Sequence, residues 1–142
     1  MNTKSSIFLI ASIMTVFSIM MIPNGISAET NQNVITVTPI NEKISLQETV
    51  TTMNIPQDNK LPWGAVKGSA FDYVEGFPVI IQIYKGEDPI HFSQVDVNGD
   101  GSYEYKFRIR NLDLNTGEVV NIFEGDYTVK IFRVIPNTNS LV

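Results

Sequence analysis

The chain of 142 residues contains no cysteine, one histidine and one tryptophan. The absence of cysteine excludes disulfide bonds, a thiol nucleophile, cysteine-ligated metal and lipid attachment at a cysteine. His91 alone cannot form a histidine cluster for a metal ion, so we interpret it as a surface residue of a strand. The acidic residues lie mostly in turns, where solvation explains them. We therefore expect no enzyme: no catalytic residue and no bound cofactor.

Basic residues are also scarce. The chain has 10 Lys and Arg against 15 Asp and Glu, which gives a formal net charge of −5. An acidic chain repels phosphate backbones and anionic lipid. Nucleic acid and membrane surfaces are therefore excluded as the expected partners.

The N-terminal residues have the layout of an export signal. Lys4 precedes an uncharged apolar run, 7–22, and a small-residue segment then ends at Ala28. The run is short for a membrane span, which needs about 20 apolar residues. We predict a signal helix at residues 1–28 that is removed on export after Ala28; the alternative is an uncleaved N-terminal anchor. A secreted or cell-surface location follows, with no membrane association after cleavage.

The remaining chain changes character at Trp63. Residues 29–62 are rich in Asn, Gln, Thr and Glu and lack aromatic residues. We interpret them as a polar extended arm or linker that contains two β-prone pieces, 34–37 and 49–55. Residues 63–136 are predicted to form the folded domain, and 137–142 a flexible tail.

The domain is predicted to be all-β. In residues 102–109, Tyr and other apolar residues alternate with polar ones, which is typical of a strand with one face in the core. Further strands are expected at 66–71, 78–84, 90–97, 118–123 and 127–134. No segment after residue 28 shows helical periodicity with caps. Short strands with regular turn signals favour a two-sheet antiparallel sandwich.

Three segments carry a resemblance to a known family: "VKGSAFDYVEGFPVIIQIYKG", "VDVNGDGSYEYKF" and "FEGDYTVKIF". In the last, Tyr127 follows a glycine at the start of a late strand and resembles a tyrosine corner. Residues 63–135 resemble the immunoglobulin-like modules of secreted and surface proteins of archaea, particularly ammonia oxidisers. More loosely, they resemble carboxypeptidase-regulatory or transthyretin-like sandwiches. The resemblance implies an immunoglobulin-like β-sandwich at the cell surface and carries over no catalytic residue.

The segment "DVNGDG", 96–101, matches the first half of a calcium-binding loop. Asp96, Asn98 and Asp100 occupy the first three ligand positions, but Phe107 stands where a bidentate carboxylate belongs. We interpret the segment as the turn of a β-hairpin, because Gly and Asn tolerate the positive φ angles of such turns. The alternative is a calcium site formed by these three residues.

Four further residues are candidates for partner contact. Trp63 stands at the start of the domain, either as a core plug or as an exposed aromatic residue for carbohydrate stacking. Lys106, Arg108 and Arg110 follow one face of a predicted strand. That face is either simply solvated or a docking patch for an acidic partner or glycan.

The end of the sequence suggests an open sheet edge. An immunoglobulin-like sandwich has one more strand after the tyrosine corner, yet only "PNTNSLV" follows Ile135. We expect "VITV" or "ETVTTMNI" to fill this edge, from the same chain or from a neighbour, in which case the protein self-associates. The sequence thus favours a secreted, non-enzymatic module with a structural or protein-interaction role at or near the cell surface. The alternative is a calcium- or carbohydrate-binding surface protein.

Overall fold

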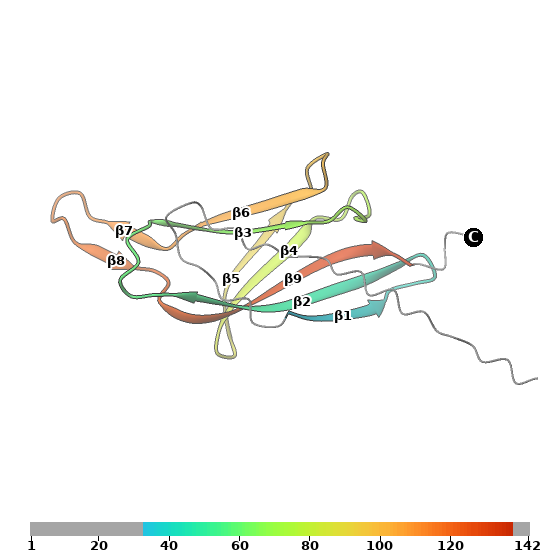
Figure 1. Cartoon of the computed structure of the whole chain (residues 1–142), viewed down its shortest axis with the longest axis horizontal. Helices are drawn as coiled ribbons and strands as arrows, with labels where there is room; N and C mark the ends of the chain where they lie inside the picture. The colour runs from blue at the N-terminus through green and yellow to red at the C-terminus, as the bar shows by residue number, and fades with distance from the viewer. Residues whose placement is uncertain (1–32, 138–142) are drawn as a thin grey trace, which may run out of the picture.

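In the computed structural model, which describes residues 33–137, the chain forms an all-β antiparallel domain (Figure 1). Residues 1–28, the predicted signal peptide, lie outside the described residues. Within 33–137 no helix is long and apolar enough to cross a membrane. The strands of the described part are β1 (Val34–Pro39), β2 (Ile44–Ile55), β3 (Trp63–Ser69), β4 (Val79–Lys85), β5 (Asp88–Val95), β6 (Ser102–Arg108), β7 (Arg110–Leu112), β8 (Val119–Asn121) and β9 (Gly125–Pro136).

Five strands form the main sheet, in the order β1-β2-β9-β4-β5, with every neighbouring pair antiparallel. The longest pairing joins β2 and β9 over their full lengths, from Ile44 opposite Pro136 to Ile55 opposite Gly125. Along β9 the buried side chains of Tyr127, Val129 and Ile131 alternate with half-buried ones. This period of two gives β9 one face in the core, as the sequence predicts.

A second layer, the two-stranded sheet β3–β6, lies over one face of the main sheet (Figure 1). The core between the layers combines Val66, Tyr103 and Phe107 with buried residues of the main sheet. Gly64 and Gly68 allow this packing, because a Cβ atom at either position would overlap the ring of Phe107 or Tyr103. The small hairpin β7–β8 projects from one end of the molecule (Figure 1).

The described part of the predicted arm is folded into the main sheet as β1 and β2. Met53 and Ile55 at the end of β2 belong to the hydrophobic core. The segment is polar although it belongs to the sheet, because the first part of β2 buries polar residues on its inward face. These inward residues are Ser45, Gln47, Thr49 and Thr51.

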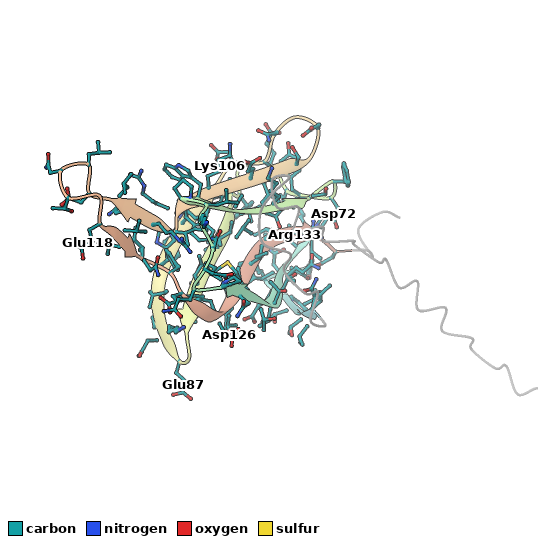
Figure 2. The ribbon with its side chains drawn as sticks, turned by 60° about the vertical axis from the view of Figure 1, so that its left-hand side comes forward. Asp72, Glu87, Lys106, Glu118, Asp126 and Arg133 are labelled. Atoms are coloured by element: carbon teal, nitrogen blue, oxygen red, sulfur yellow. The ribbon has the colours of Figure 1, made fainter. Side chains whose placement is uncertain are left out.

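Buried Gln47 has a specific partner. Its Oε1 accepts a hydrogen bond from Nε of Arg133 at 2.7 Å, and Nη1 of Arg133 lies 2.6 Å from Oδ1 of Asp72. Figure 2 shows Arg133 and Asp72 side by side. Arg133 therefore links β2, β9 and the loop that carries Asp72, and a buried charge is tolerated because it is paired and hydrogen-bonded.

The edge of β9 that was expected to be open is occupied by β2 of the same chain. The strand that fills this edge was expected to come from the same chain or from a neighbour, and in the structure it comes from the same chain. The edges of the main sheet are consequently β1 and β5. At the start of β9 the Tyr127 hydroxyl accepts a hydrogen bond from the backbone N–H of Glu124 at 2.6 Å. This bond ties the side chain at the start of β9 to the backbone three residues upstream.

Candidate functional site

The most distinctive surface of the domain is the outer face of the β3–β6 sheet, turned away from the core. The pairing of β3 with β6 places Trp63 directly opposite Arg108 and Lys67 opposite Glu104. Lys106 lies between Glu104 and Arg108 on the same face of β6. We call this surface the cationic face and define it as Trp63, Lys67, Glu104, Lys106 and Arg108.

Trp63 is an exposed platform. Its side chain is 49% exposed, and the guanidinium of Arg108 lies over the indole ring with its carbon 5.1 Å from the ring centroid. A cation in this position is attracted by the negative face of the ring. Trp63 is therefore a surface residue and does not plug the core. Trp63 and Arg108 lie directly opposite each other on adjacent strands, so their side chains share one face of the sheet and come into contact.

The charges of the cationic face form a network around one carboxylate. Nζ of Lys67 and Nζ of Lys106 each lie 3.2 Å from an oxygen of Glu104. The hydrogen bond from Lys67 holds the pKa of Glu104 below its usual value, and Lys106 acts in the same direction. Three cations against one carboxylate leave this face positive on a chain whose net charge is −5. Figure 2 shows Lys106 on the side of β6 that points away from the main sheet.

Arg110, the fourth contact candidate, is separated from the cationic face. Its Nη2 donates a hydrogen bond to the backbone carbonyl of Gln57 at 3.2 Å. The backbone N–H of Ile109, beside it, donates to the carbonyl of Pro62 at 2.8 Å. Arg110 thus helps to hold the loop between β2 and β3 in place.

The segment 96–101 joins two sheets and is not the turn of a hairpin. β5 before it pairs with β4 in the main sheet, whereas β6 after it pairs with β3 in the second layer. The hairpin interpretation is wrong, because alternation in two successive strands does not reveal whether they pair with each other. The turn chemistry is nevertheless as expected, since Gly101 has a φ of 80°.

Two of the three calcium-ligand candidates serve the turn itself. Oδ1 of Asp100 accepts hydrogen bonds from the backbone N–H of Ser102 at 2.9 Å and from its hydroxyl at 2.6 Å. These bonds lower the pKa of the Asp100 carboxyl. Nδ2 of Asn98 donates to the same hydroxyl at 3.1 Å, while Asp96 is exposed just before the turn. Across residues 33–137, no three His, Cys, Asp or Glu side chains gather closely enough to hold a metal ion.

His91 is half-buried on β5, contrary to its interpretation as a solvated surface residue. Its Nε2 is hydrogen-bonded to the hydroxyl of Tyr105, and its ring stacks on the Tyr105 ring with centroids 5.5 Å apart. The rings of Phe107 and Phe123 lie at 6.4 and 6.2 Å. His91 is thus part of an aromatic cluster beneath the second layer. The sequence carried no signal for this, because the neighbouring apolar residues Ile90 and Phe92 lie on the exposed face of β5.

No known protein-family model matches the chain, and neither a curated protein nor a solved structure shows significant similarity to it. The sequence and the geometry therefore carry the functional argument.

Proposed function

We propose that this protein is a secreted, non-enzymatic β-sandwich of the immunoglobulin-like type, with an interaction role at or near the cell surface. In this proposal the cationic face binds an acidic partner, a protein or a glycan. The single observation that carries the proposal is the exposed indole of Trp63 beneath the guanidinium of Arg108, within a positive surface of an acidic chain.

The immunoglobulin-like assignment is supported by topology. β3–β6 stacks on a sheet in which β9, the strand with the Tyr127 corner, lies between β4 and β2. β2 runs antiparallel to β9, in the place where the last strand of such a sandwich would lie. The layout of residues 1–28 supports export.

The chemistry of the cationic face suits recognition of a carboxylated surface. The Trp63 ring offers an apolar plane on which a sugar ring or a peptide side chain can stack. Lys106 is 61% exposed and Arg108 is exposed, so both side chains can contact an anionic group with no change in the backbone of β6. Attraction between exposed charges is screened beyond about 8 Å at physiological salt, so binding should weaken as salt is raised.

The emission of Trp63 provides the test, because it is the only tryptophan of the chain. Residues 29–142, which include every strand described here, are titrated with polyglutamate and with polygalacturonate. We expect a saturable change in emission with at least one probe. Lys106→Glu should weaken that binding about fivefold, because an exposed charge contact contributes up to about 1 kcal/mol.

The matched control is Lys43→Glu, the same charge change in the exposed turn between β1 and β2. It should leave the affinity within experimental error. Equal weakening by the two variants would show that only net charge matters and would contradict a site on β3–β6. Absence of any emission change with either probe would contradict the proposal as a whole.

Calcium binding at Asp96, Asn98 and Asp100 is the second candidate function. It is supported by the oxygen-bearing side chains of Asp96, Asn98 and Asp100, which lie at alternate positions of one short exposed segment. It would require Asp100 to exchange its hydrogen bonds with Ser102 for metal coordination.

A further inference from the structure

We propose that β1 is a self-association site, at which two copies of this chain pair edge to edge around a two-fold axis perpendicular to the main sheet. The inference goes beyond the binding role of the cationic face and rests on different residues. Its basis is the contrast between the two edges of the main sheet.

The β5 edge is protected against strand pairing at its start. Pro89 lies within the strand and has no backbone N–H to donate. The pairing of β4 with β5 shifts its register between Ile83 and Tyr84, which leaves Ile90 as an extra residue. Proline and bulges are the features by which natural sheets prevent edge pairing.

The β1 edge lacks these features between Val34 and Thr38. All six residues of β1 are exposed, and the strand contains no charged residue. Val34, Ile35 and Val37 are 60%, 43% and 51% exposed, respectively. An uncharged edge strand rich in β-branched residues is a template for another strand. Natural edges usually carry a charge at such positions, so its absence indicates that this edge is covered in the working protein.

A second copy is the partner that fits this edge best. A two-fold axis perpendicular to the sheet makes β1 antiparallel to itself, which is the more stable arrangement of strands. The absence of charge in β1 means that self-pairing places no like charges opposite each other. The nearest carboxylate, that of Glu48 beside Thr36, already lies 3.7 Å from Nζ of Lys130.

The register follows from side-chain alternation, because opposite residues must share a face of the sheet. Centring the axis on Thr36 pairs it with Thr36 of the second copy and places Ile35 opposite Val37. This register uses residues 34–38 fully, and it covers apolar residues on one face of the edge. Val37 also lines a groove with Pro39 and Ile135, and Ile35 of the second copy would extend over it.

This arrangement keeps the same face of the sheet upward in both copies. The β3–β6 layers, and with them both cationic faces, would point to the same side. If the proposed function holds, the dimer is bivalent and binds a repetitive surface with an avidity above the affinity of one site. Pairing of one short strand is small for a protein interface, so dimerisation should depend on concentration.

The absence of cysteine makes a direct test available. In the chain 29–142, Thr36→Cys places two thiols opposite each other, at a Cα separation of about 4.5–5.5 Å, within the range that a disulfide spans. Oxidation should yield a covalent dimer in high yield. Gln94→Cys, also exposed and on the β5 edge, is the control and should remain largely monomeric.

Sedimentation provides the complementary measurement. The unmodified chain should shift from monomer to dimer between low micromolar and millimolar concentration. Thr36→Lys should stay monomeric with an unchanged melting midpoint, because two lysines would face each other across the axis, whereas Gln94→Lys should still dimerise. A monomer at every concentration, or cross-linking at position 94 equal to that at 36, would overturn the proposal. Neither result would affect binding of acidic probes by the cationic face.

Discussion

For two buried tyrosines, Tyr127 and Tyr103, we expect the loss of the hydroxyl group to change the stability of the protein in different ways. The Tyr127 hydroxyl accepts the 2.6 Å hydrogen bond from the backbone N–H of Glu124. The Tyr103 hydroxyl is buried and has no hydrogen-bond partner among residues 33–137. Both side chains are nearly inaccessible, with exposed fractions of 6% and 1%. Replacement by Phe keeps the ring and removes only the oxygen.

The expected free energies follow from these environments. Tyr127→Phe removes a net hydrogen bond and should lower the free energy of unfolding by about 1 kcal/mol. The ring would still contact Phe123, whose centroid lies at 5.3 Å. Tyr103→Phe removes an unsatisfied polar group, whose burial costs about 1–3 kcal/mol, and should leave the protein equally stable or raise its stability by about 1 kcal/mol.

Urea unfolding of residues 29–142, followed by Trp63 emission, measures both changes. The two variants should differ by about 1–2 kcal/mol in free energy of unfolding, which corresponds to roughly 4–8 °C in melting midpoint, since a domain of this size shifts by about 4 °C per kcal/mol. Loss of more than about 1 kcal/mol in Tyr103→Phe would show that its hydroxyl is satisfied in solution. An unchanged stability of Tyr127→Phe would refute the structural role of the hydrogen bond between Glu124 and Tyr127.

Three further predictions concern charges. Burial raises the pKa of Tyr103 to about 12 from 10.0. The stability contributed by the protonated Tyr103 is therefore complete below pH 10 and is lost as the pH rises toward 12. Urea unfolding should show a steeper alkaline decline in stability for the unmodified chain than for Tyr103→Phe. Arg133→Met should lower the free energy of unfolding by about 2 kcal/mol, because buried Gln47 loses its donor, whereas Asp72→Asn should cost less because Asp72 is half exposed. The Asp100 carboxyl should titrate below its usual pKa of 3.8 in an NMR titration, and its pKa should return toward that value in Ser102→Ala. Excess calcium should leave the melting midpoint unchanged. A calcium-dependent rise in the midpoint that Asp100→Ala abolishes would instead establish a metal site.

Much of the local structure could be predicted from the sequence. The alternation in residues 102–109 identified β6 and its buried aromatic residues, because a period of two is set by the backbone geometry of a strand. All eight segments expected to be β-structure overlap observed strands. The strand β7 was missed, because its three residues are too few to show a pattern, and its pairing with β8 requires the turn between them.

Pairing between distant segments could not be predicted in the same way. The polar β2 was interpreted as an arm because its buried face carries Thr and Gln. The presence of a buried Gln47 is explained only by its hydrogen bond with Arg133 on β9. The alternation also showed that Lys106 and Arg108 share a face. It could not show that Trp63 joins them, because this depends on the register of β3 against β6.

Binding at a cell surface through the cationic face is the central claim, and it can be measured on cells. Fluorescently labelled residues 29–142 are incubated with cells of the source organism, together with two variants, Lys106→Glu and Lys43→Glu. We predict that the unmodified chain and Lys43→Glu associate with the cells and that Lys106→Glu loses most of this association, with equal melting midpoints for all three. Equal association of all three chains, or none with any of them, would contradict the claim.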